Sequence, residues 1–274
     1  MIEKQTAVGK IVKWGLLIIL SIFALLPLYA VLIVALTPSS HVMNMQLFPK
    51  FFEISNFGTG FISVGRGIGN SFLYSIIATF MALIISVPAA YVLGRYNFKG
   101  KRAILFSLLF TQMIAGIVLL PSLYMFFQKL NISNSIPGLI VVMCGVNLAL
   151  VVWIFYGYFQ TLPVGIEEAA MIDGCNYVGM LLRIIIPLSG PSIAVGAIFV
   201  FINTYNEFVI PLFLLTDRTQ YTLTLTLYSM LTDTTIRWEV VAASSLIAII
   251  PPVFIFIFFQ KYIISGLTTG AVKS

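Results

Sequence analysis

Charged side chains are scarce in this sequence, because only 9% of its 274 residues are Asp, Glu, Lys or Arg. An ordinary soluble domain carries about 25% charged residues and about 45–50% apolar ones, whereas 60% of this chain is hydrophobic. Such a composition excludes a single soluble core. Cysteine is also rare, with Cys144 in an apolar run and Cys175 in a polar segment, so a disulfide framework is excluded as well.

Residues that carry chemistry are equally sparse. The phosphate-binding pattern Gly-x-x-x-x-Gly-Lys-Ser/Thr is absent, so the chain is not expected to hydrolyse ATP. His41 is the single histidine and has no Cys or His neighbours, which favours a surface histidine over a metal ligand. No nucleophile with a base and no ligand cluster stands out in the apolar runs. We therefore expect no catalytic residues, no metal and no cofactor in this chain.

Long apolar runs dominate what is present. A helix of about 20 apolar residues crosses a hydrocarbon core of about 30 Å, and backbone groups in lipid must be satisfied within helices. The sequence therefore predicts an all-α, polytopic membrane protein in which residues 1–274 form one domain with six transmembrane helices. The six runs are approximately 14–36, 70–94, 103–127, 137–160, 187–216 and 240–262.

Basic residues set the predicted orientation, because Lys and Arg favour the cytoplasmic side of a membrane. The cluster of Arg95, Lys99, Lys101 and Arg102 lies in a very short connection between two runs. Placing this cluster inside puts both termini and residues 162–186 in the cytoplasm. The net charge of +6 is then explained by this asymmetry and does not require a nucleic-acid partner.

The 162–186 segment is too polar for its surroundings. Glu167, Glu168 and Asp173 fall within it, and each such charge costs roughly 2.5–3.5 kcal/mol at the centre of a membrane. Acids in a first helical turn and Gly174 as a terminator predict two short helices joined by a turn. With the small residues Ala169 and Ala170, this loop has the chemistry of a docking surface, although a merely solvated acidic loop remains an alternative.

The same segment resembles the cytoplasmic signature of permease subunits of ABC importers. The matching residues are Glu168-Ala169-Ala170, Gly174, Ile184 and Ile186-Pro187, with Ile186 where that family usually has Leu. The resemblance implies that the segment holds a coupling helix which inserts into a cleft of an ATP-binding subunit. The residues to which it gives that role are Glu167, Glu168, Ala169, Ala170, Asp173 and Gly174.

Two further stretches, 206–214 leading into 221–224 and 260–273, are similar to permeases for carbohydrate uptake, of the kind that includes the second membrane subunit of maltose importers. That resemblance implies a bacterial or archaeal plasma membrane and a sugar or oligosaccharide as substrate. It also implies several partners: a second, different permease, two ATP-binding subunits that carry ATP and Mg²⁺, and an extracytoplasmic sugar-binding protein. The external segment 217–238 suits contact with that protein, or is an uncommitted hairpin.

Polar residues inside the runs are candidates for a substrate pathway or gate. Glu207 is the single acid in the six runs, and an acid at membrane depth must face the bundle interior, water or a partner. Its role is either structural and gating or direct sugar contact. The full set of pathway candidates is Gln112, Tyr124, Asn147, Asn203, Tyr205, Asn206 and Glu207.

Three classes of function are candidates for such a chain. The first is a permease driven by an external ATPase through alternating access. The second is an ion-coupled secondary transporter of small polar solutes, although one buried acid makes a poor proton relay and no paired halves are evident. The third, a membrane-embedded enzyme, lacks candidate residues. The first hypothesis accounts best for the polar 162–186 segment.

Overall fold

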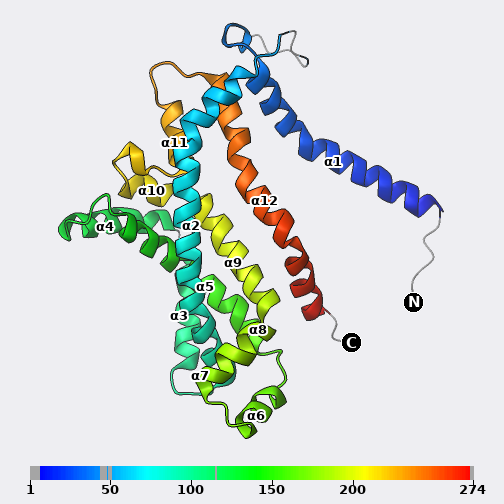
Figure 1. The fold of residues 1–274 in the computed structure, drawn as a ribbon, viewed down its shortest axis with the longest axis vertical. Helices are drawn as coiled ribbons and strands as arrows, with labels where there is room; N and C mark the ends of the chain where they lie inside the picture. Colours follow the sequence, from blue (N-terminus) through cyan, green and yellow to red (C-terminus); the bar gives the residue numbers. More distant parts are fainter. Residues whose placement is uncertain (1–6, 44–47, 49–50, 115, 272–274) are drawn as a thin grey trace. The chain divides into compact units, whose positions relative to one another are not determined.

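The structure is a computed structural model that describes residues 7–43, 48, 51–114 and 116–271, and the described residues contain helices and no strands. Figure 1 shows the chain as a series of long and short helices. The α-helices are α1 (Ala7–Leu36), α2 (Ser55–Arg95), α3 (Lys101–Met113), α4 (Gly116–Lys129), α5 (Ile136–Phe159), α6 (Gly165–Ile172), α7 (Tyr177–Met180), α8 (Ile186–Leu188), α9 (Gly190–Tyr205), α10 (Val209–Leu214), α11 (Leu223–Leu231) and α12 (Trp238–Ala271). A π-turn, Leu181–Ile185, joins α7 to α8, and short 3₁₀ turns lie at Ser39–His41 and Arg218–Gln220.

The chain divides into two compact units, which are described separately. The first comprises residues 1–65 and 227–249, and the second comprises residues 66–226 and 250–274. Both candidate sites discussed below lie in the second unit.

Four described helices are long and apolar enough to cross a membrane: 12–36 of α1, α2, α5 and 238–261 of α12. Two further pairs pass the same test together but are bent by more than 40° at a short break, namely α3 with α4 and the 177–188 helix with α9. The part of the chain that is described therefore contains four candidate spans by length and composition, or up to six if each bent pair is one span. The prediction of an all-helical membrane protein is confirmed at this level.

The expected fifth run, 187–216, is not one helix. α9 ends at Tyr205, residues 206–208 are not helical, and α10 begins at Val209. Pro211 explains the break, because proline has no N–H to donate to the carbonyl four residues earlier, which is that of Glu207. The hydroxyl of Thr224 donates to that carbonyl instead, at 2.7 Å. Asn206 and Glu207 consequently lie in a break between helices rather than inside a continuous span.

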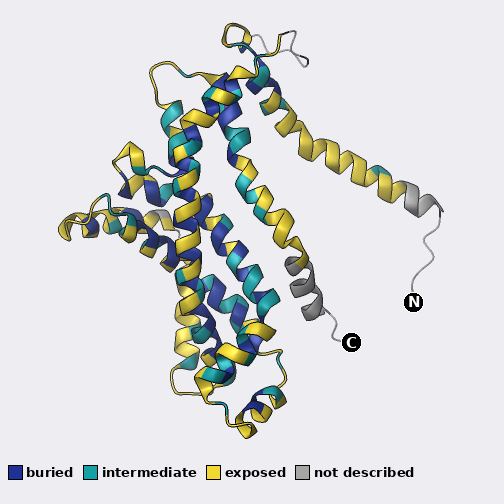
Figure 2. Cartoon of the chain, in the orientation of Figure 1, coloured by how far each residue is buried: buried dark blue, intermediate teal, exposed yellow. Residues whose placement is uncertain are grey.

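The core of the second unit forms where α5 packs on α9. Phe155 and Phe159 of α5 are fully buried, and Gly196 of α9 lies so close to Phe155 that a Cβ there would come within 2.4 Å of its Cζ. The same hydrophobic cluster includes Tyr91 of α2 and Ala170 of α6. Figure 2 shows α6 with a buried inner side and an exposed outer side. This cluster is therefore what seats α6 on the end of the helical core.

In the first unit, α1 is largely exposed and apolar. Trp14 is 65% exposed and Phe23 is 78% exposed, which is typical of a helix whose neighbours are lipid or another chain. At its end, the side-chain amide of Asn56 donates to the carbonyls of Ala35 (3.0 Å) and Thr37 (3.2 Å). These bonds attach α1 to the start of α2.

Candidate functional site

The 162–186 segment folds as the two short helices that its sequence predicts. Glu167 and Glu168 lie in the first turn of α6, where the helix dipole favours acids. Gly174 ends the helix with a φ of +82°, a left-handed conformation that glycine adopts without a Cβ penalty. The side chain of Asn176 then caps α7 by accepting from the Gly179 N–H at 2.7 Å.

The structure divides the six candidate coupling residues into two groups. Glu168, Ala169, Asp173 and Gly174 are exposed. Glu167 and Ala170 are not, with exposed fractions of 7% and 4%. Glu167 therefore turns into the protein, whereas Glu168 and Asp173 are exposed.

Apolar side chains that were not among the candidates share the exposed side of α6. Met171 is 44% exposed and Ile172 is 87% exposed. Together with Glu168 and Ala169 they form the outer face of α6. In the sequence, the only sign of these two side chains was their position directly after the small residues Ala169 and Ala170.

Arg95, the last residue of α2, is the partner of Glu167. Its Nε lies 2.5 Å from Glu167 Oε1, and the side chains are 9% and 10% exposed. Its Nη2 also donates to the carbonyl of Leu162 at 2.8 Å. Breaking a buried ion pair by removing one partner typically costs about 3–5 kcal/mol. One arginine therefore holds both the entrance of the segment and its first helix.

Aromatic rings surround this ion pair. Tyr91 packs edge-on against Tyr96 with centroids 6.2 Å apart, and Tyr96 packs in the same way against Tyr177 of α7, also at 6.2 Å. Burial raises the pKa of the Tyr96 phenol, and the neighbouring Tyr177 and the charge of Glu167 act in the same direction. The three rings thus form a continuous row from the end of α2 to α7.

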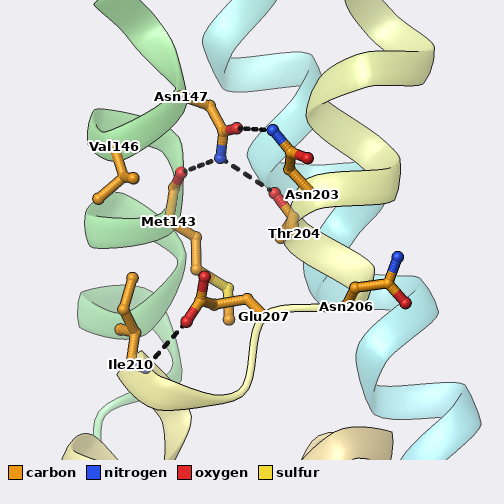
Figure 3. Close-up of a pocket in the computed structure, with 8 residues that line it drawn as sticks. All are labelled: Met143, Val146, Asn147, Asn203, Thr204, Asn206, Glu207 and Ile210. Carbon is orange, nitrogen blue, oxygen red and sulfur yellow. Dashed lines mark hydrogen bonds between the residues drawn. The ribbon is translucent and has the colours of Figure 1, made fainter. Parts of the chain in front are cut away.

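A second candidate region is the pocket at the break between α9 and α10 (Figure 3). Its volume is about 190 Å³, and the residues that line it are Met143, Val146, Asn147, Asn203, Thr204, Asn206, Glu207 and Ile210. A neighbouring, mostly apolar cavity of about 640 Å³ shares Val146, Glu207 and Ile210 with it and is otherwise lined by α4, α5 and α10. Glu207 thus stands where a polar and an apolar cavity meet.

Amide side chains link α5 to α9 beside this pocket. Asn147 Nδ2 donates to the carbonyl of Met143 at 2.8 Å and to the hydroxyl of Thr204 at 3.5 Å. Asn203 Nδ2 donates to Asn147 Oδ1 at 3.3 Å. Buried Asn147 is therefore a structural cross-link, whereas Asn203 and Asn206 are exposed.

Glu207 has a structural use that its position in an apolar run did not reveal. Its Oε1 accepts from the backbone N–H groups of Val209 (2.9 Å) and Ile210 (3.1 Å). A carboxylate at the beginning of a helix satisfies donors that lack intrahelical partners. The acid therefore stabilises the start of α10, and with it the break in the fifth run.

Only part of the predicted pathway set comes together. Asn147, Asn203, Asn206 and Glu207 line one pocket. Tyr205 is 1% exposed and stacks on Phe201, with centroids 5.8 Å apart, so it packs the helix. Gln112 lies near the end of α3, and Tyr124 of α4 accepts from Gln128 at 2.9 Å; neither lines the pocket. Thr204 and Met143 were missed, although each lies next to, or one turn from, a predicted asparagine.

Side chains of α2 hold the backbone that follows α10. Asn70 Nδ2 donates to the carbonyls of Thr219 (3.0 Å) and Tyr221 (2.9 Å), and Ser71 Oγ accepts from the N–H of Leu223 at 2.9 Å. The Asp217 carboxylate accepts from the N–H of Thr219 at 2.8 Å, and this hydrogen bond lowers the pKa of the exposed acid. Part of the predicted external segment 217–238 is thus a fixed turn.

These features define a polytopic helical membrane protein whose polar groups lie at helix breaks and on a short loop helix. The chain belongs to the family of binding-protein-dependent transport system inner membrane components, whose model matches residues 86–269. The predicted resemblance to importer permeases is confirmed, and the chain is a membrane component rather than an enzyme. The secondary-transporter and membrane-enzyme alternatives are not favoured.

Relatives with established names cover most of the chain. It is 32% identical to the arabinooligosaccharides transport system permease protein AraQ of Halalkalibacterium halodurans, over 96% of this chain and 97% of the relative. It is 38% identical to the trehalose/maltose transport system permease protein MalG of Thermococcus litoralis, over 74% of each chain.

The fold also matches a solved structure. A chain in the crystal structure of a bacterial ABC transporter involved in the import of the acidic polysaccharide alginate superposes with a TM-score of 0.80. The match covers 96% of this chain and 99% of that chain, at 23% sequence identity. The two chains therefore share a fold.

Proposed function

We propose that this chain is the permease subunit of an ATP-driven importer for a sugar or oligosaccharide, in which it forms half of the translocation pathway. The observation that carries the coupling half of this proposal is the outer face of α6, an exposed patch of small and apolar residues between α5 and α9. The sugar half rests on the relatives, whose names specify arabinooligosaccharides, trehalose and maltose.

The proposal includes the partners that such a subunit needs. They are a second, different permease chain, two ATP-binding subunits and an extracytoplasmic sugar-binding protein. ATP and Mg²⁺ are bound by the ATP-binding subunits. The chain crosses the plasma membrane six times, with each bent helix pair counted as one span, and both termini and the 162–186 segment are cytoplasmic. The source is a bacterium or an archaeon.

Coupling works through a difference in affinity between two states. A ligand shifts a conformational equilibrium only if it binds one state more tightly than the other. Closure of the ATP-binding subunits on ATP moves α6, which lies in their cleft as a coupling helix. The spans then pass from an inward-facing to an outward-facing arrangement. Glu168, Ala169, Asp173 and Gly174 contact the ATPase, whereas Glu167 and Ala170 fasten the helix to this chain.

At the α9–α10 break, Glu207 serves the pathway structurally, because its carboxylate is engaged with backbone N–H groups. Asn203 and Asn206 are the exposed amides of the pocket. Amide groups donate and accept hydrogen bonds, so they suit the hydroxyl groups of a neutral sugar better than further charges would.

Two substitutions on α6 test the coupling role. Gly174→Trp and Glu168→Lys are expected to abolish copurification of the ATP-binding subunits with the tagged permease, and to abolish ATP-dependent uptake of radiolabelled maltose, trehalose and arabinose oligosaccharides. Gly100→Trp is the matched control, because Gly100 also has a positive φ, of +96°, with open space around it, and lies outside α6. The control should retain both activities.

Retention of the ATP-binding subunits and of uptake in both α6 variants would refute docking through this helix. The alternative function has its own test. If proteoliposomes containing this chain without ATP-binding subunits accumulated any of these sugars under a proton gradient, an ion-coupled mechanism would replace the proposal.

A further inference from the structure

Arg95 joins two parts of the second unit that are far apart in sequence. It ends α2, a helix that runs without interruption from Arg66 to Arg95 within this unit. Its guanidinium group contacts the carboxylate of Glu167 at 2.5 Å and the carbonyl of Leu162 at 2.8 Å. One side chain thus grips both the first helix of the 162–186 segment and the backbone that leads into it.

α6 depends on such attachments. It has eight residues, and isolated helices shorter than about 12–15 residues are marginal in water. Two buried side chains connect it to the core: Ala170, in the cluster with Tyr91 and Phe159, and Glu167, through Arg95. The alanine methyl group adds buried contact area but does not fix the orientation of the helix, whereas the buried ion pair of Glu167 with Arg95 fixes the position of one charged side chain against another.

We propose that Arg95 is the positioning residue that makes α6 and the end of α2 move as one body when the ATP-binding subunits close. This inference rests on the proposed coupling role of α6 and adds the element of this chain to which the motion is delivered. The carboxylate of Glu167 is the point of attachment, and Glu168, the next residue, remains free on the outer face of α6.

The guanidinium group is specifically required. Its Nε forms the ion pair with Glu167 while its Nη2 donates to the carbonyl of Leu162, and the planar guanidinium group fixes these two contacts relative to each other. Lysine carries the same charge on one freely rotating ammonium group, so it holds the carboxylate and the carbonyl in a less fixed geometry. The proposal therefore predicts a graded series, in which lysine is intermediate between arginine and glutamine.

The test measures the distance between α6 and α2 in the assembled transporter. Spin labels are placed at Val164→Cys at the N-cap of α6 and Val92→Cys on α2, which are 56% and 44% exposed, in a Cys144→Ala/Cys175→Ser background. Distance distributions are recorded without nucleotide and with ATP plus vanadate. Arg95→Gln, Arg95→Lys and Glu167→Gln are compared with Arg102→Gln, which removes an exposed arginine from the same basic cluster.

The unsubstituted complex should give one narrow distribution that ATP plus vanadate does not shift. Arg95→Gln and Glu167→Gln should each broaden it to roughly twice the width, Arg95→Lys should fall between, and Arg102→Gln should leave it unchanged. The double variant should be no broader than either single one, since the two residues form one interaction.

Two results would overturn the proposal: a shift of the unsubstituted distribution on ATP binding, or an unchanged distribution in Arg95→Gln. If Arg95→Gln fails to fold, Arg95→Lys alone decides. A distance distribution as narrow as that of the unsubstituted complex would then refute the requirement for an arginine that contacts both Glu167 and Leu162. Failure of the proposed function looks different. In that case Gly174→Trp still copurifies with the ATP-binding subunits, whatever the α6–α2 distance does.

Discussion

Gly196→Ala is expected to destabilise the packing of α5 on α9. A Cβ at this position would lie 2.4 Å and 2.6 Å from two ring atoms of Phe155 and 3.3 Å from a methyl group of Val151. Cβ atoms in proteins essentially never lie within 3.0 Å of a non-bonded heavy atom, so one of the groups in contact has to shift. Phe155 is fully buried, so either its ring or α9 has to shift to admit the methyl group.

The magnitude follows from the cost of overpacking a closely packed core, which is about 1–3 kcal/mol per inserted group. A second substitution separates this steric term from any other effect. Phe155→Leu removes the ring atoms that the new methyl group meets, at the cost of a cavity. The loss of unfolding free energy in the double variant should therefore be smaller than the sum of the two single losses by about 1–2 kcal/mol, within the usual range for residues in direct contact.

The assay is an unfolding titration of the purified membrane complex with a denaturing detergent, in which the loss of helix packing is followed by tryptophan fluorescence. Gly145→Ala is the matched control. Gly145 also lies within a membrane helix, in α5, but a Cβ there meets nothing within 4 Å. Because alanine is the better helix former, this control should be neutral or slightly stabilising.

Additive effects of Gly196→Ala and Phe155→Leu would refute the steric reasoning. So would equal effects of Gly196→Ala and Gly145→Ala, because they would show that the loss of a glycine matters and the neighbouring ring does not.

Three further predictions concern other contacts. Glu207→Ala should destabilise the complex by about 1–3 kcal/mol in the same titration, since it leaves two N–H groups without their acceptor. Glu207→Gln should cost less because its amide oxygen still accepts, and equal losses of stability in the two variants would argue against capping. Asn70→Ala should speed hydrogen exchange within 219–223 by releasing two carbonyls, and unchanged exchange would show that this turn holds without it. Gly60→Ala places a Cβ 3.1 Å from both the backbone nitrogen and the hydroxyl of Ser244, so Ser244→Ala should relieve only part of the loss; full relief would mean that the backbone contact is harmless.

Much of the architecture was predictable, because helix spans and helix ends are recorded in local sequence. Apolar runs of membrane length located α1, α2, α5 and α12, although the runs 103–127 and 187–216 are each broken into separate helices. Gly174 marked the end of α6, since few other residues adopt its backbone conformation without strain. These signals depend on a residue and its immediate neighbours. They need no knowledge of the rest of the chain.

The functional arrangement of neighbouring acids was less accessible. Glu167 and Glu168 are adjacent and chemically alike, yet one is buried and the other is exposed. The difference arises from Arg95, which is distant in sequence and meets Glu167 only in the folded chain. Similarly, the sequence presents Glu207 as a lone acid inside a span. Pro211 leaves the backbone carbonyl of Glu207 without its helical donor, and the hydroxyl of Thr224 donates to that carbonyl instead. This second contact is visible only in the folded chain.

The cap formed by Glu207 has a consequence for how the fifth run is held in the membrane. The groups that satisfy Glu207 all follow it in sequence: the N–H groups of α10 bond its carboxylate, and the hydroxyl of Thr224 bonds its carbonyl. Until α10 is folded, the acid is a lone charge in an apolar run, and such a charge costs roughly 2.5–3.5 kcal/mol at the centre of a membrane. A chain truncated after residue 208 should therefore hold this run in the membrane less firmly than one extended past residue 224. The stability of the fifth span thus depends on the folding of the segment that follows it.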